Sequence, residues 1–461
     1  MGAKLMACAL VVTLLPGTAV GTPARGISWT GADCTPDVAV ECGTLELPVD
    51  WNRPGGARFG MRVARVAAAE PARRLGVLVV LPGGPGDSGV DYVRRMKAAL
   101  DPEVRDRFDL VGFDARGIGR STPVVCSTGL QARRPSAYPR DDAEFDRLVA
   151  FNRELRADCG RHTGPIAEHA DSASVVRDLE ALRGALGERK ISVFGHSYGT
   201  VVGIAYAERH GDHLRALAMT GIFDPSSTAR ELLERSAVAV EEAFGEFVAW
   251  CDRTPTCALH GRDVRAAWDE RLARADADPT AHPTANEWSL GAMLLLYGPD
   301  YPRLAAMIVG TEAVPAPPAP RAENPAEAVF CADFRVDVRE VGDLEHLAAV
   351  GRRAAPHLRG AVRQHGVVAA CAGRPTARPG HAFRPHRDAP PILLLNSRFD
   401  PAGVHSAALA VERQSRGRAT LVTYDGPGHN VYARTECTRG AVDRYLLDVV
   451  VPATGTHCAG A

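Results

Sequence analysis

The stretch FGHSYGT, residues 194–200, constrains the fold of this chain more than any other feature of its sequence. It carries the pattern G-x-S-x-G around Ser197, between the apolar run 191–194 and the small-residue-rich run 200–207. The first run is typical of a buried strand and the second of a closely packed helix. A strand that turns directly into a helix needs small residues two positions before and after the serine, because larger side chains would collide with the neighbouring element. Such a turn lifts the hydroxyl clear of the sheet edge, beside the positive end of the helix, so Ser197 is predicted to be a nucleophile.

Six further apolar runs are bounded by turn residues, and helical patterns lie between them. The runs comprise residues 61–67, 76–81, 108–113, 216–219, 392–395 and 419–424. Short continuous runs of this kind suit strands that are buried on both faces of a mostly parallel sheet. Their alternation with helices indicates an α/β fold.

The alternation is interrupted in the second half of the chain. Helical patterns there continue without obvious buried strands, over residues 231–250, 264–273 and 290–309. We predict a mainly helical cap inserted over the sheet, residues 225–388. The insertion divides the core into a first part, residues 25–224, and a second part, residues 389–461.

The N-terminus and the cysteines indicate export. Lys4 precedes an apolar run, residues 5–15, that is too short to span a bilayer, and residues 1–24 are expected to be a signal peptide. No later segment is long and apolar enough to cross a membrane, so a secreted protein is expected. Ten cysteines follow the signal, and an even number in an exported chain predicts disulfides. Pairing neighbours in order is the simplest arrangement: Cys34–Cys42, Cys126–Cys159, Cys251–Cys257, Cys331–Cys371 and Cys437–Cys458.

Charge and motifs exclude several kinds of partner. The 54 basic and 55 acidic residues give a formal net charge of −1, which gives no reason to expect nucleic acid as a partner. The sequence lacks the C-x-x-C and H-E-x-x-H spacings of zinc sites, so neither a metal nor another cofactor is expected.

A serine nucleophile needs a histidine base, and the base needs an orienting carboxylate. Asp400 follows the predicted strand at 392–395, and His429 follows the predicted strand at 419–424. The order Ser, Asp, His, with the last two on loops at strand ends, predicts a triad of Ser197, Asp400 and His429. Asp425 stays open as an alternative carboxylate, because it lies on the same loop as His429.

Two backbone N–H groups are expected to stabilise the developing oxyanion. One is expected from the loop GGPGDSG, which directly follows the predicted strand at 76–81, and the other is that of Tyr198. The loop lacks the G-K-[ST] ending of a phosphate loop. Asp114 and Arg116, after the next predicted strand, are expected to brace loops near the site.

The motifs GGPGDSG, VGFDARGIGRS, GHSYGT, RFDP and DGPGH resemble those of the secreted tripeptidyl aminopeptidases of actinomycetes, in the prolyl-aminopeptidase branch of α/β-hydrolase serine peptidases. The resemblance covers nearly the whole chain after the signal. It implies an α/β-hydrolase fold with a cap, the triad Ser197, Asp400 and His429, and oxyanion donors at Gly84 and Tyr198. It departs at Gly403, where relatives commonly carry threonine three residues after the triad aspartate.

The resemblance also implies that acidic cap residues bind the free amine of a peptide substrate. Asp333, in Cys331-Ala332-Asp333, is the first candidate; the alternatives are Glu231, Glu234, Glu241 and Glu242. The expected function is that of a monomeric serine exopeptidase acting on peptides. A carboxylesterase or lipase, a hydrolase dedicated to one natural-product peptide, and a non-catalytic binding protein on the same fold stay open as alternatives.

Overall fold

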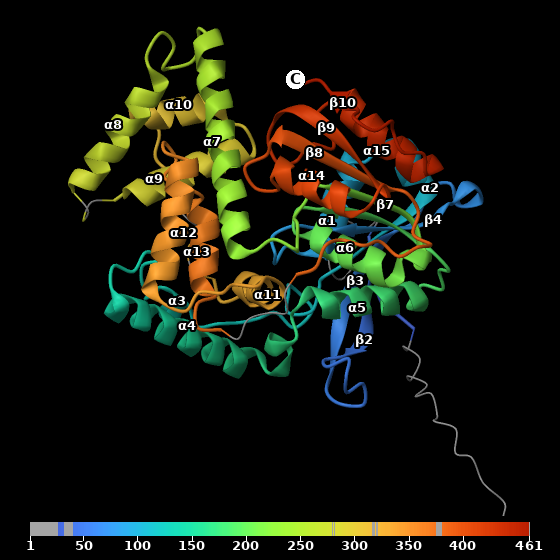
Figure 1. Ribbon diagram of the computed structural model, residues 1–461. Helices are drawn as coiled ribbons and strands as arrows, with labels where there is room; N and C mark the ends of the chain where they lie inside the picture. Colours follow the sequence, from blue (N-terminus) through green and yellow to red (C-terminus); the bar gives the residue numbers. More distant parts are fainter. Residues whose placement is uncertain are drawn as a thin grey trace, which may run out of the picture.

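A ten-stranded, mostly parallel sheet forms the centre of the computed structural model, which describes residues 26–460 except 32–39, 279, 281, 316–318, 320 and 375–379 (Figure 1). The strand order is β1-β2-β3-β5-β4-β6-β7-β8-β9-β10. Strands β1, β2 and β3 pair antiparallel with one another, and β3 pairs antiparallel with β5. From β5 to β10 every pairing is parallel. The expected signal peptide lies outside the described residues.

All seven apolar runs form strands, which confirms the α/β prediction. The strands are β1 (Ser28–Gly31), β2 (Glu41–Pro48), β3 (Arg58–Val66), β4 (Gly76–Leu81), β5 (Phe108–Phe113), β6 (Ile191–His196), β7 (Leu214–Thr220), β8 (Ile392–Phe399), β9 (Ala419–Pro427) and β10 (His457–Cys458). Every residue of β4 is buried, in keeping with a central strand that is covered on both faces. The edge strands β1 and β10, and β2, which pairs with β1 and β3, are not among the predicted runs.

Helices cover both faces of the sheet. The buried side chains of α1 (Gly89–Ala99), α2 (Pro102–Arg107) and α15 (Glu436–Asp448) share one hydrophobic cluster. Those of α5 (Ser172–Ala185), α6 (Gly199–His210) and α14 (His405–Gln414) share the cluster on the opposite face. The short 3-10 helices are Pro71–Arg73, Pro165–Glu168 and Gly211–His213. The result is a three-layer core with the sheet in the middle.

Seven helices lie between β7 and β8, where the sequence predicts the cap, and gather beside the sheet (Figure 1). They are α7 (Ala229–Arg253), α8 (Val264–Ala277), α9 (Ala285–Tyr297), α10 (Tyr301–Val309), α11 (Pro325–Asp333), α12 (Val341–Ala354) and α13 (Val362–Ala370). Within the helical pattern at residues 290–309, Gly298 and Pro299 separate α9 from α10. The Asp300 side chain then caps the new helix by accepting a hydrogen bond from the N–H of Arg303.

The helical layer also recruits a segment from the first part of the chain. Helices α3 (Thr128–Gln131) and α4 (Asp142–Thr163) precede β6, yet their apolar side chains belong to the same cluster as those of α7 to α13. Asn152 on α4 donates to the carbonyls of Ala369 and Ala372 at 3.0 and 3.1 Å. Figure 1 shows α4 running along the lower side of α12 and α13.

Four disulfides have the predicted pairing in sequence order. Two lie within the helical layer, Cys251–Cys257 and Cys331–Cys371, and Cys437–Cys458 fastens β10 to α15. Cys126–Cys159 joins the segment before α3 to α4. Cys42 is also disulfide-bonded, whereas Cys34, its predicted partner, lies outside the described residues.

Arg116 and Asp114 brace the loops beside the sheet, as the sequence predicts. The fully buried Arg116 guanidinium donates to both carboxylate oxygens of Asp178 at 2.7 and 2.6 Å and to the carbonyl of Val49 at 2.7 Å. Asp114 accepts hydrogen bonds from the Ser88 hydroxyl and from the N–H of Arg120 at 2.5 and 2.8 Å. A buried guanidinium with this many partners ties three segments together.

We expect Arg116→Met to lower the free energy of unfolding by about 3–5 kcal/mol, because it leaves Asp178 buried without its cation. Urea denaturation measures this change. The matched control is Arg230→Met, which removes an exposed arginine 3.9 Å from Glu234 and should cost no more than about 1 kcal/mol. Equal, small losses in both variants would show that Arg116 does not act as a brace.

Candidate active site

Ser197 lies at the turn between β6 and α6 in a left-handed backbone conformation, with φ at 55°. Its N–H donates to the carbonyl of Thr220 at 2.8 Å. A Cβ at Gly199 would lie 2.5 Å from the carbonyl oxygen of Leu81, so this position excludes any side chain. The turn predicted from G-x-S-x-G is therefore present, and crowding by neighbouring backbone explains its second glycine.

Asp400 and His429 closely follow the ends of β8 and β9, and both side chains are buried. The Nδ1–H of His429 donates to the two carboxylate oxygens of Asp400 at 2.9 and 2.8 Å. Asp400 is fixed in turn by the N–H groups of Ala402 and Gly403, at 2.8 and 2.9 Å. Nε2 of His429 is buried and has no hydrogen-bond partner among the described residues. This nitrogen is therefore free to accept a proton.

The competing candidates lie elsewhere or have other partners. Asp425 pairs with His457 at 3.0 Å and is partly exposed, so Asp400 is the carboxylate that orients His429. His196 packs against His429, with ring centroids 4.8 Å apart, and its Nδ1 lies 2.9 Å from the Thr220 hydroxyl. Burial, with the nearby His429, holds the pKa of His196 well below its usual value, which keeps this imidazole neutral.

The loop after β4 lies directly against the serine. A Cβ at Gly83 would be 2.8 Å from Cβ of Ser197, so only glycine allows this approach. Gly84 follows with φ at 111°. The structure thus brings the predicted oxyanion loop to the nucleophile candidate, beside the N-terminus of α6.

Asp333 lies at the C-terminal end of α11, next to the turn that carries Ser197. Its carboxylate accepts hydrogen bonds from the Tyr198 hydroxyl at 2.6 Å and from the N–H and hydroxyl of Ser172 at 2.8 and 2.6 Å. Burial raises the pKa of Asp333 to about 6, although these hydrogen bonds oppose the increase. Asp333 also borders a groove of about 630 Å³ between α5 and α6. The contact with Tyr198, which the sequence does not reveal, connects the helical layer to the turn.

The four glutamates of α7 are used differently. Glu231 caps the helix through Thr228, and Glu241 accepts from the N–H groups of His357 and Leu358 at 3.4 and 3.2 Å. Glu234 lies on the surface beside Arg230. Burial raises the pKa of Glu242, and the nearby Arg398 guanidinium opposes the increase. Arg398 precedes Asp400 by two residues. Of the four glutamates, Glu242 is therefore the one whose charged neighbour lies close to Asp400 in the sequence.

Tyr297, the last residue of α9, is a site residue that the sequence analysis missed. Its carbonyl accepts the N–H of His429 at 3.0 Å, and its ring lies 4.5 Å from the His429 ring. Burial raises the pKa of Tyr297 to about 12; Asp400 adds to the increase, and the Ser197 side chain opposes it. The pattern of α9 could not indicate this role, because it depends on how the helix packs over the sheet.

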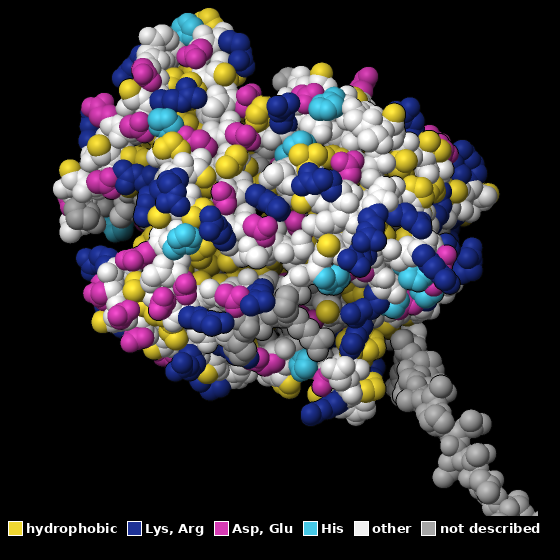
Figure 2. All heavy atoms as spheres, in the orientation of Figure 1, with side chains coloured by type: hydrophobic (Ala, Val, Ile, Leu, Met, Phe, Trp, Pro, Cys, Tyr) yellow, Lys and Arg dark blue, Asp and Glu magenta, His cyan; other side chains and the backbone are white. Residues whose placement is uncertain are grey.

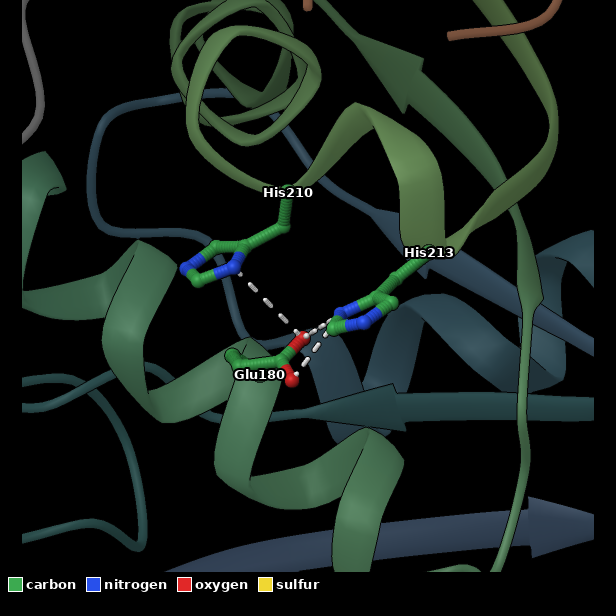
Figure 3. Close-up of side chains that lie close together, drawn as sticks. All are labelled: Glu180, His210 and His213. Atoms are coloured by element: carbon green, nitrogen blue, oxygen red, sulfur yellow. Dashed lines mark hydrogen bonds and ion pairs between the residues drawn. The ribbon is translucent and has the colours of Figure 1, made fainter. Parts of the chain in front are cut away.

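One group of metal-ligating side chains occurs within the described part of the chain, Glu180, His210 and His213 (Figure 3). The Glu180 carboxylate is already occupied by Arg183, which donates from Nε and Nη2 at 3.1 and 2.5 Å, and by the Tyr206 hydroxyl at 2.9 Å. Burial acts to raise the pKa of Glu180, but these hydrogen bonds outweigh it and bring the pKa to about 2. The Glu180 carboxylate of this cluster, near the C-terminal end of α6, is therefore already engaged in hydrogen bonds with protein side chains.

Basic and acidic side chains are interspersed across the face drawn in Figure 2. Among the described residues, no helix is both long and apolar enough to cross a bilayer.

We expect Asp400→Asn to lower kcat about 10³–10⁴-fold, because the amide would favour the wrong tautomer of His429. The asparagine oxygen can still accept from the loop N–H groups, so the fold should persist. Turnover of any accepted substrate measures the effect, with Asp425→Asn as the control at near wild-type activity. A large loss in Asp425→Asn with none in Asp400→Asn would show that Asp425, and not Asp400, is the carboxylate that supports His429.

Gly403 is expected to tolerate no side chain. A Cβ there would lie 2.3 Å from the carbonyl carbon and oxygen of Gly221, and Gly221 itself leaves no room beside the His429 ring. Gly403→Thr, the residue common in the resembling family, should therefore lower the free energy of unfolding by about 3 kcal/mol or more and reduce activity.

Urea denaturation compares Gly403→Thr with Gly440→Ala, where a Cβ would meet nothing within 4 Å. The control lies within α15 and should be neutral or stabilised by up to about 1 kcal/mol. A threonine variant as stable and active as the wild type would refute the steric explanation for this departure from the family pattern.

The comparisons with known proteins agree with this geometry. A family model described as "alpha/beta hydrolase fold" matches residues 76–433. The serine protease Hip1 of Mycobacterium tuberculosis is 29% identical over 464 residues, which cover 90% of this chain and 87% of that protein. Carboxylesterase B of the same species is 31% identical over 499 residues, with coverage of 96% and 92%.

Tripeptidyl aminopeptidase of Streptomyces lividans is 25% identical over 473 residues, which cover 94% of this chain and 87% of that protein. This match confirms the resemblance drawn from the motifs. Because the family model covers most of the chain and the relatives share nearly its full length, the chain belongs to the α/β-hydrolase family and is a serine hydrolase.

Proposed function

We propose that this serine hydrolase is an exported, monomeric exopeptidase that releases short peptides from free N-termini. Ser197 Oγ attacks the peptide carbonyl, His429 Nε2 takes the hydroxyl proton, and Asp400 holds the imidazole. The N–H groups of Gly84 and Tyr198 stabilise the oxyanion. His429 then donates the proton to the departing amine, and water hydrolyses the acyl-enzyme. The four disulfides support a location outside the cytoplasm.

The observation that carries the peptidase proposal is the 2.6 Å contact between Asp333 and the Tyr198 hydroxyl. In this contact a carboxylate binds the side chain of the residue that follows the proposed nucleophile, which supports a role for Asp333 beside the site. Oδ1 of Asp333 accepts one hydrogen bond, so it keeps the capacity to accept from an ammonium group. The carboxylate also borders an open groove lined by residues of α5 and α6, so it can be reached from the surface. We therefore propose Asp333 as a contact for the substrate amine as well as an anchor for Tyr198.

An esterase is the second candidate, supported by the similarity to carboxylesterase B. It would use the same triad and oxyanion donors, but it would have no need for a carboxylate beside the nucleophile. The requirement for a free amine therefore distinguishes the two functions.

The test compares three substrates: a tripeptidyl p-nitroanilide with a free N-terminus, its N-acetylated form and a short-chain p-nitrophenyl ester. The wild type should cleave the free peptide best, and Ser197→Ala should cleave none. Asp333→Asn should lower kcat/KM for all substrates, because Tyr198 loses its acceptor. It should cost a further tenfold or more with the free peptide, on the scale of a charged hydrogen bond in a desolvated site.

Asp337→Asn is the control, since Asp337 pairs with Arg335 on the surface. Equal losses with free and acetylated peptides would leave Asp333 as an anchor for Tyr198 only. Ester turnover far above peptide turnover would favour the esterase. If no substrate is turned over and no fluorophosphonate labels the protein, the fold serves binding and not catalysis.

A further inference from the structure

The turn at residues 297–299 connects the helical layer to the base of the site. The N–H of His429 donates to the carbonyl of Tyr297 at 3.0 Å. One residue earlier, a Cβ at Gly428 would lie 2.8 Å from Cδ of Pro299, so the loop that carries His429 is in close contact with this turn. A main-chain hydrogen bond and a glycine-mediated contact thus fix the loop from the side of the cap.

The Tyr297 side chain extends the same contact to the imidazole. Its ring lies 4.5 Å from the His429 ring at an interplanar angle of 50°, on a histidine that His196 already contacts from another side. Asp400 fixes Nδ1 of this imidazole by hydrogen bonds, and the two neighbouring rings restrict its tilt. The orientation of the base therefore depends on a residue from α9.

The hydroxyl of Tyr297 lies on the side of the proposed nucleophile, and the Ser197 side chain is among the groups that act on its pKa. Tyr297 is thus in contact with both the nucleophile and the base of the proposed triad.

We propose that Tyr297 is a positioning residue of this site: its carbonyl and ring hold His429, its hydroxyl faces Ser197, and helix α9 thereby helps to place both groups. The inference rests on the proposed function of Ser197 and His429. It makes the cap a part of the catalytic machinery as well as a cover for the substrate.

The test separates the hydroxyl from the ring with Tyr297→Phe and Tyr297→Leu. Phenylalanine keeps the carbonyl and the ring and removes only the hydroxyl. This loss should lower kcat and the rate of labelling by a fluorophosphonate about 10–100-fold, with KM changed less than about threefold. Leucine also removes the ring from His429 and should lower both rates further. Thermal unfolding of Tyr297→Phe should match that of the wild type.

Tyr301→Phe is the matched control, because the Tyr301 hydroxyl in α10 is buried with no hydrogen-bond partner among the described residues. It should stay within about twofold of the wild type in both rates. Wild-type labelling and turnover in Tyr297→Phe would overturn the inference and leave the proposed function intact. A wild type that is neither labelled nor active would overturn the proposed function, and with it this inference.

Discussion

The left-handed backbone of Ser197 is the constraint on which the rest of the site depends. A φ of 55° at a non-glycine residue is strained, and it persists only where the surroundings fix it. Here the hydrogen bond to Thr220 and the close approach of the Leu81–Gly84 segment fix the turn from two sides. The approach of this segment needs glycine at both Gly83 and Gly199, so the sequence of the turn and that of the neighbouring loop are determined together.

The same steric argument extends to the base. Gly403 packs against the backbone of Gly221, and Gly221 packs against the His429 ring. Two glycines that lie 182 positions apart in the sequence thus leave the space in which Asp400 and His429 meet. The departure from the family pattern at Gly403 follows from this packing, and it needs no difference in the chemistry of the triad.

The helical layer contacts the site at two points. Asp333 on α11 holds the side chain of Tyr198, and Tyr297 on α9 holds the loop of His429. A movement of these helices would therefore alter the residue beside the nucleophile and the base together.

The sequence predicts the parts of the structure that depend on local pattern. Strands such as β4 are apolar throughout because they are covered on both faces, and the positions of Asp400 and His429 follow from the ends of β8 and β9. Strand β2 escapes prediction because glycine, proline and two glutamates interrupt its apolar pattern. Gly298 and Pro299 explain the break between α9 and α10, although the residues around them continue an apolar helical pattern. The contacts of Asp333 and Tyr297 could not be predicted, because they arise from packing between helices and core.

The central claim is that the turn at Ser197 presents an activated nucleophile. Peptide mapping by mass spectrometry after brief reaction with a fluorophosphonate tests it most directly. The account predicts a single adduct, on Ser197, that forms only while the protein is folded. An adduct on another residue, or none under conditions that label a known serine hydrolase, would contradict it.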